Sequence, residues 1–248
     1  ERNGWQTTHT VVEVICDDMP FIVDSMRMVI NRMGLSAHLI IHMGGIKVKR
    51  DEHHRVCEVY PRNSQATGAG ITNEAPIFMQ IDRQTDPALL DELYQNFQRA
   101  LEDNRVVYED WDKMRAEVKD AIADLDNVTN VLDANEVQET KALLHWIEDH
   151  HFTFLGIRDY RLIKKGKDTL LEAVPNTGLG VLRDSLSVGH TRNISAMAPE
   201  AQEFMLSPRI LVMSKTNNLA TVHRNAYTDY IGIKQFNHEG KVVGERRI

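Results

Sequence analysis

The chain has 248 residues, and its 36 acidic side chains outnumber 29 basic ones to give a formal net charge of −7. This balance excludes nonspecific nucleic-acid binding through a basic surface. No apolar run reaches the roughly 20 residues that cross a bilayer, and no signal-peptide pattern opens the sequence, so we expect no membrane partner. Hydrophobic residues make up 42%, enough for one large domain or two ordinary ones. Two isolated cysteines, Cys16 and Cys57, read as buried thiols and favour a cytoplasmic protein.

The most informative stretch joins a strand to a helix through an acidic turn. Residues 10–16 are rich in β-branched side chains, which predicts a strand bounded by two aspartates. An apolar series at helical spacing follows, with Pro20 suited to the first turn and Gly34 at the end: Ile22, Met26, Val29, Ile30 and Met33. The free backbone donors at such a helix N-terminus can receive a carboxylate. The candidate effector site is therefore the turn formed by Asp17, Asp18, Met19, Pro20, Phe21, Ile22, Val23 and Asp24.

Residues 37–110 continue the alternation of strand and helix. Residues 37–50 predict a strand with a bulge or bend at Gly44-Gly45, residues 55–60 a shorter strand, and residues 61–75 a loop before a strand around 77–81. Asp86 and Pro87 begin a helix whose apolar side is Leu90, Leu93, Phe97 and Leu101. Residues 106–108 predict a last short strand. This order is the βαββαβ plan of a ferredoxin-like sandwich, so the predicted class is α+β with a first domain over residues 1–110.

The remaining sequence predicts a helical linker and a second domain. Residues 111–151 carry two amphipathic helices, the second capped by Asp133 with Glu136. Residues 152–248 are mostly strand, and we expect a second α+β domain on an antiparallel sheet, truncated at its C-terminal end. Its elements are a strand opening at 152–157, a hairpin of 209–214 with 220–224 around Asn217-Asn218, a hairpin of 230–236 with 241 onwards, and a helix over 199–206. Glu1 is not an initiating methionine, so we expect a piece of a longer protein.

Other candidate chemistry is weak, and no catalytic, cofactor-binding or metal-binding residue is predicted in this segment. Capping and the helix dipole explain Asp17, Asp18 and Asp24 better than a metal site, and His38 and His42 share a strand face without further ligands at a recognisable spacing. The loop 178–183 resembles half of a dinucleotide fingerprint but has arginine in place of the third glycine, which favours a conformationally special loop. An anion site remains an alternative to scattered surface arginines for Arg158, Arg183, Arg192 and Arg224 with Asn225.

Several stretches together resemble the amino-terminal region of the large bacterial NAD-dependent glutamate dehydrogenases. The resemblance is carried, in order along the chain, by residues 17–25, 152–156, 178–183, 222–226, 230–234 and 240–245. It implies a much longer parent that deaminates L-glutamate oxidatively to 2-oxoglutarate and ammonia with NAD, through a catalytic domain downstream. It also implies ACT-like and PAS-like regulatory domains here, the second domain being PAS-like or another ACT-like variant.

The resemblance sets expectations for partners and cofactors as well. The segment would act with its own downstream catalytic domain, as part of a homo-oligomer, with an amino-acid effector and with no bound NAD of its own. One departure concerns the turn, because amino-acid-binding ACT domains usually have glycine where this chain has Phe21. Its side chain would obstruct or reshape a ligand pocket, leaving the domain for packing or oligomerisation. The alternative reading is a free-standing amino-acid-sensing module of the ACT type.

Overall fold

The computed structural model describes residues 4–61, 63–186 and 191–248. The chain divides into two compact units. Unit 1 contains Glu1–Arg105 and Thr221–Asn225, and unit 2 contains Val106–Ala220 and Ala226–Ile248. The predicted domain boundaries at 110 and 151 stay predictions. Within the described residues, no helix is long and apolar enough to span a membrane.

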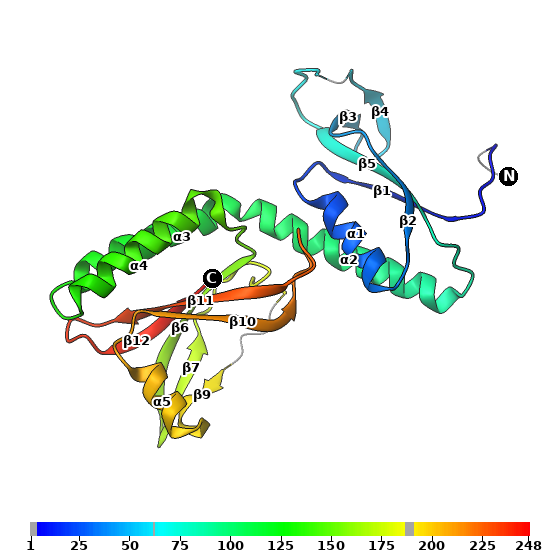
Figure 1. Cartoon of the computed structure of the whole chain (residues 1–248). Coiled ribbons are helices and arrows are strands. Elements are labelled where there is room, and N and C mark those ends of the chain that lie inside the picture. Colours follow the sequence, from blue (N-terminus) through cyan, green and yellow to red (C-terminus); the bar gives the residue numbers. More distant parts are fainter. Residues whose placement is uncertain (1–3, 62, 187–190) are drawn as a thin grey trace. The chain divides into compact units, whose positions relative to one another are not determined.

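Unit 1 contains one antiparallel sheet and two helices (Figure 1). Its elements are β1 (Thr10–Asp17), α1 (Ile22–Arg32), β2 (Ala37–His42), β3 (Ile46–Arg50), β4 (Val56–Val59), β5 (Ile71–Ile81) and α2 (Pro87–Glu109). The strand order is β1-β5-β3-β4, and β2 also pairs with β5. β2 and β3 therefore share one partner strand, and the chain bends between them at Gly44-Gly45, as predicted. β5 begins at Ile71, so the predicted loop 61–75 is shorter than expected.

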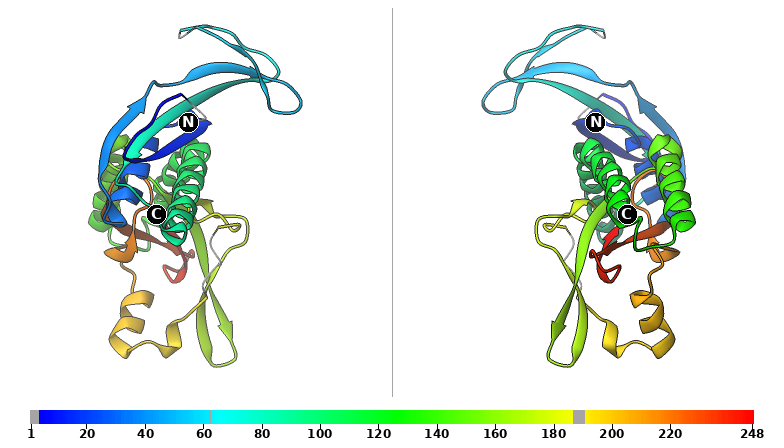
Figure 2. Two further views of the ribbon diagram at one scale, coloured as in Figure 1. Left: turned by 90° about the vertical axis from the view of Figure 1, so that its right-hand side faces the viewer. Right: turned by 90° about the vertical axis from the view of Figure 1, so that its left-hand side faces the viewer.

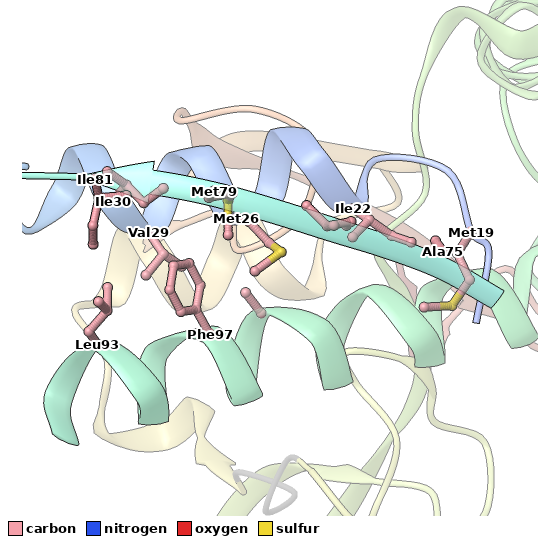
Figure 3. Close-up of a cluster of buried hydrophobic side chains, with 12 residues drawn as sticks. Met19, Ile22, Met26, Val29, Ile30, Ala75, Met79, Ile81, Leu93 and Phe97 are labelled. Carbon is pink, nitrogen blue, oxygen red and sulfur yellow. The ribbon is translucent and has the colours of Figure 1, made fainter. Parts of the chain in front are cut away.

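The core of unit 1 lies between the sheet and the two helices. The register places Val12 opposite Met79 and Val14 opposite Ile77, so alternate side chains of β1 and β5 share one face. These side chains pack against the apolar stripe of α1 and against Leu93 and Phe97 of α2 (Figure 3). The core positions predicted on both helices are thus confirmed except for Leu90, which is 36% exposed. Cys16 is half-buried at the margin of this core, whereas Cys57 on β4 is exposed, so the prediction of two buried thiols was wrong for Cys57.

The predicted strand at 106–108 was wrong, because these residues form the last turn of α2. Valine pairs favour strands in isolation, but no glycine or proline interrupts the helix that begins at Pro87. Val106, Val107 and Asp110 are buried at helical spacing, so tertiary packing outweighs local β propensity. The α+β class is confirmed, while the sheet of unit 1 lacks the final strand of the predicted plan and leaves β1 at its edge.

Unit 2 begins with α3 (Trp111–Asp124) and α4 (Ala134–Trp146), joined through the short helix η1 (Leu125–Val128). Both helices were predicted. The predicted cap is also confirmed, since the Asp133 carboxylate accepts a hydrogen bond from the Glu136 amide at 2.8 Å. A single π-helical turn, η2 (Ile147–His151), follows α4. α3 contacts strands of the unit 2 sheet, so the helices pack with that sheet.

The sheet of unit 2 is antiparallel in every pairing, with the order β10-β11-β12-β6-β7-β9, and β8 pairs with β6. In both views of Figure 2 the β6–β7 hairpin extends past the neighbouring strands. The elements are β6 (Gly156–Lys165), β7 (Asp168–Ala173), β8 (Leu179–Gly180), β9 (Arg192–Asn193), η3 (Ile194–Ala196), α5 (Pro199–Leu206), β10 (Leu211–Leu219), β11 (Tyr227–Phe236) and β12 (Val242–Arg247).

Two strand predictions in unit 2 need correction. The opening strand begins at Gly156 instead of 152. Asn217-Asn218 do not form a hairpin turn but lie inside β10, where the register shifts between Lys215 and Leu219 and the Thr216 hydroxyl accepts a bond from the Asn218 amide. Residues 220–224 are therefore not a strand, and the connection between β10 and β11 contains the segment that belongs to unit 1.

Candidate functional site

The predicted effector turn lies between β1 and α1, and its backbone is set by Phe21. Phe21 is the N-cap residue of α1 with φ 65° and ψ 5°, in the left-handed region that favours glycine. Its carbonyl accepts the first helical hydrogen bond from the Ser25 amide at 2.9 Å. Pro20 precedes this cap, so its predicted place in the first helical turn was wrong. The left-handed conformation is one that glycine adopts without strain, and here phenylalanine adopts it.

Contacts with β5 and α2 hold the turn on both sides. The Asp18 amide donates to the Asn73 carbonyl at 2.9 Å, and the Asn73 side-chain amide donates to the Asp18 carboxylate at 3.2 Å. Asn104, only 1% exposed, donates to the Pro20 carbonyl at 2.9 Å. Met19 and Ile22 point into the hydrophobic core (Figure 3). The turn is thus a rigid part of the fold, because a buried amide and two core side chains fix it.

The carboxylates of the turn do not converge. Asp18 contacts Asn73, while Asp17 is exposed at the end of β1 and Asp24 is exposed in the first turn of α1. His38 and His42 were considered as a pair of metal ligands. In the structure the His38 ring is hydrogen-bonded to the Asp82 carboxylate at 2.7 Å. Among the residues that the structure describes, no group of three or more His, Cys, Asp or Glu side chains is placed to hold a metal ion.

The segment Thr221–Asn225 packs directly against this turn within unit 1. The Phe21 and His223 rings lie 4.3 Å apart between centroids, and the His223 amide donates to the Ser25 hydroxyl at 3.3 Å. At the other end of α1, Arg32 donates through two nitrogens to the Asn225 side-chain carbonyl at 3.0 and 2.9 Å. Residues 222–226 contributed to the sequence resemblance, but their proximity to the turn had no signal in the sequence, because it depends on a contact some 200 positions apart.

The segment Thr221–Asn225 is also held by a buried side chain and by a hydrogen bond to α2. Val222 is buried, and the Asp103 carboxyl group bonds Thr221. Burial raises the pKa of Asp103, with Glu102 acting in the same direction and Thr221 and Arg99 opposing it. Burial also raises the pKa of Cys16 to about 11, helped by Asp17, Asp18 and Glu74. The surroundings of the turn therefore disfavour additional buried negative charge.

The pKa of His223 is lowered, first by burial and then by Arg224, with Asp24 opposing the shift. Protonation is thus less favourable in the folded chain than in the unfolded one. The contribution of His223 is fully present above its unfolded pKa of about 6.5 and is lost as pH falls below it. We expect the free energy of unfolding to decrease between pH 7 and pH 5 and His223→Gln to flatten that decrease. Urea unfolding of the unaltered chain and of His223→Gln between pH 7 and pH 5 measures this change in free energy. His238→Gln, on a different turn, is the control.

Two of the arginines considered as an anion site are already paired with carboxylates. Arg183 donates to Asp110 at 2.6 Å and contacts Glu109 at 2.9 Å, and Arg158 pairs with Asp184. Arg224 lies in unit 1, whereas Arg158, Arg183 and Arg192 lie in unit 2. Since Arg158 and Arg183 are already paired with carboxylates, the structure does not support the anion site.

The loop 178–183 is conformationally special, as predicted. Gly180 has φ 58°, and a Cβ there would lie 2.2 Å from the Leu155 carbonyl oxygen. Its amide donates to the buried carboxylate of Asp110 at 2.9 Å, and Arg183 and Lys113 donate to the same carboxylate. Burial raises the pKa of Asp110, but these donors outweigh it and leave the pKa well below its usual range. The loop is a structural clamp on the start of α3.

Comparison with known proteins gives a match to the N-terminal part of the chain and matches over its whole length. Residues 1–97 match the family described as the ACT1 domain of glutamate dehydrogenase. Over 248 residues the chain is 34% identical to an NAD-specific glutamate dehydrogenase of Halomonas elongata, and over 247 residues it is 31% identical to one of Pseudomonas aeruginosa. The matches cover 100% of this chain but only 15% of each relative. The resemblance seen in the sequence is confirmed.

Proposed function

We propose that this chain is a non-catalytic regulatory and assembly segment of a large NAD-dependent glutamate dehydrogenase, because residues 1–97 match the ACT1 domain family of glutamate dehydrogenase. The whole enzyme would deaminate L-glutamate oxidatively to 2-oxoglutarate and ammonia, with NAD bound outside this segment. The alignment with NAD-specific glutamate dehydrogenases over the whole chain supports this function. Its partners would be the catalytic domain of the same polypeptide and further copies in a homo-oligomer.

The observation that carries the proposal is the packing of the segment Thr221–Asn225 against the effector turn of residues 17–24. The Phe21 ring lies against His223, and the segment Thr221–Asn225 runs beside both ends of α1. The Phe21 and His223 side chains thus lie against each other beside the turn, in the space where we propose that a small ligand would otherwise bind. A turn filled in this way suits a role in holding parts of the polypeptide together, since its contacts are already made.

Calorimetry of the 248-residue chain tests whether catalysis resides elsewhere. We expect no saturable heat on titration with NAD, with or without L-glutamate, up to millimolar concentrations, because no cofactor motif is found in the chain. The full-length polypeptide, titrated in the same buffer, is the positive control. Saturable NAD binding to the 248-residue chain would overturn the proposal.

For the second domain we propose a PAS-like identity over an ACT-like one. The strands of unit 2 form the hairpin β6–β7 and the consecutive run β10-β11-β12, and β12 pairs with β6. A βαββαβ unit needs a helix after its first strand, whereas β6 passes to β7 through a tight turn at Gly166. This connectivity supports the PAS-like alternative.

The second candidate function is amino-acid sensing at residues 17–24. It is favoured by the amides of the first turn of α1, which face the N-terminal end of the helix where a carboxylate is stabilised. A thermal-shift screen of the twenty amino acids tests it. A true ligand at 100 times its Kd would stabilise the fold by about 2.7 kcal/mol. We expect no amino acid to reach this value while the Phe21–His223 contact is present, and a clear shift would instead support sensing.

A further inference from the structure

β1 is an edge strand in unit 1, because the expected strand after α2 is helical. Among the described residues, β1 pairs only with β5. The bond from the Asp18 amide to the Asn73 carbonyl fixes the phase of the antiparallel ladder, so Val12, Val14 and Cys16 bond toward β5. The backbone groups of Val11, Glu13, Ile15 and Asp17 consequently point toward the open edge. An eight-residue edge of this kind is a template for another strand.

A groove of about 950 Å³ follows this edge. It is bounded by β1 residues 12–17 on one side and by α2 side chains between Tyr94 and Arg105 on the other. Its apolar lining includes Val12, Val14 and Leu101, which are only partly buried against the core. On the opposite face of the sheet Ile15 is 65% exposed. Both faces beside the edge thus leave apolar surface that a further strand would cover.

Charge narrows the choice of occupant. Glu13 and Asp17 project from β1 on the same face as Ile15, whereas Glu74, opposite Asp17 in the register, is already bonded to Arg50. An antiparallel second copy of β1 centred on Ile15 would place Glu13 opposite Asp17, and like charges directly opposite each other are destabilising. A strand with basic side chains on this face would complement Glu13 and Asp17, and apolar side chains on its other face would lie against Val12, Val14 and Leu101.

We infer that β1 accepts a further strand from the part of the longer polypeptide outside residues 1–248. The inference rests on the proposed function, since the chain spans 15% of the length of its glutamate dehydrogenase relatives and most of the polypeptide lies elsewhere. The incoming segment pairs with the outward amides of Glu13 and Ile15, carries lysine or arginine opposite Glu13 and Asp17, and places apolar residues in the groove. It completes the sheet of unit 1 by strand addition, which is a common mode of peptide recognition.

Amide hydrogen exchange with residue resolution tests this inference. In the 248-residue chain we expect the amides of Glu13 and Ile15 to exchange about 100-fold faster than those of Val14 and Cys16, which bond to β5. In the full-length polypeptide we expect the two sets to agree within about 10-fold. Fast exchange of the outward amides in both proteins would overturn the inference. Protection in the 248-residue chain that grows with concentration would also overturn it, in favour of a second copy.

A pair of variants of the full-length polypeptide separates docking from folding. Ile15→Pro removes one outward donor and should return the Glu13 amide to fast exchange while Val14 and Cys16 stay slow; Ile15→Thr keeps the donor and is the matched control. If Ile15→Pro unfolds unit 1, the charge reversal Glu13→Lys with Asp17→Lys should expose the same amides by repelling a basic strand. Unchanged protection in the charge-reversed protein would contradict the inference. The amide exchange of β1 tests only the added strand, whereas NAD calorimetry tests the proposed function, so the two can fail independently.

Discussion

Replacing Asp110 by alanine is expected to destabilise unit 2 by about 2–3 kcal/mol, because it leaves the buried Gly180 amide and the partly buried Arg183 guanidinium without this acceptor. The Asp110 side chain is 1% exposed and accepts hydrogen bonds from the Gly180 amide, from Arg183 and from Lys113. Urea unfolding followed by tryptophan fluorescence measures the loss, since Trp111 begins the helix that Asp110 caps.

The matched control and the pH dependence sharpen this prediction. Asp112→Ala removes an exposed carboxylate two residues later on the same helix and should cost less than about 1 kcal/mol. The folded-state pKa of Asp110 is depressed, so its contribution is present above the unfolded pKa of about 3.9 and is lost as pH falls further. The penalty of Asp110→Ala should therefore be smaller at pH 3 than at pH 7. Equal losses for the two variants would show that the clamp does not stabilise unit 2.

The second large effect is expected for Gly180→Ala. The added Cβ would lie 2.2 Å from the Leu155 carbonyl oxygen, so the backbone must move, and φ 58° is itself unfavourable for alanine. Gly166 in the β6–β7 turn has φ 64° and open space around its Cβ, so Gly166→Ala carries only the conformational cost. We expect Gly166→Ala to cost about 1 kcal/mol and Gly180→Ala to cost at least about 2 kcal/mol more.

Urea unfolding of the two glycine variants under identical conditions measures that difference. If both variants lost about 1 kcal/mol in free energy of unfolding, β8 and residue 155 could move apart at no energetic cost, which would contradict the prediction. Far-UV circular dichroism of the folded variants provides a check that the sheet of unit 2 is retained in both. The comparison isolates the steric contact because φ is nearly the same at the two positions, 58° and 64°.

Much of the fold follows from local patterns that packing does not overrule. The helix of residues 199–206 was predicted to the residue, because a proline begins it and Ser207-Pro208 ends it. The Asp133 cap and the bend at Gly44-Gly45 were also predictable from residue type. In each case the decisive interactions lie within a few positions along the chain. The special character of the loop 178–183 belongs to the same class, since its glycines mark close backbone approaches.

The errors occurred where distant contacts decide the outcome. Val106-Val107-Tyr108 has the composition of a strand, yet these residues continue a long helix that buries both valines. Asn217-Asn218 has the composition of a turn, yet the chain absorbs it in a bulge and reverses later. Phe21 was expected to obstruct or reshape a ligand pocket, but its contact with His223 was not predicted. The burial of Val106 and Val107 and the contact of Phe21 with His223 depend on residues far away in the sequence, so they produce no local signal.

The sequence by itself therefore determined the resemblance to the glutamate dehydrogenases, the α+β class and the position of the acidic turn, because these depend on short patterns and their order. Only the tertiary structure decided that the segment Thr221–Asn225 lies beside that turn, that Asp110 holds the loop 178–183, and that β1 is left at the edge of its sheet. The physical reason is the same throughout. Burial and hydrogen bonding between residues far apart in the chain outweigh local preferences of less than about 1 kcal/mol per residue.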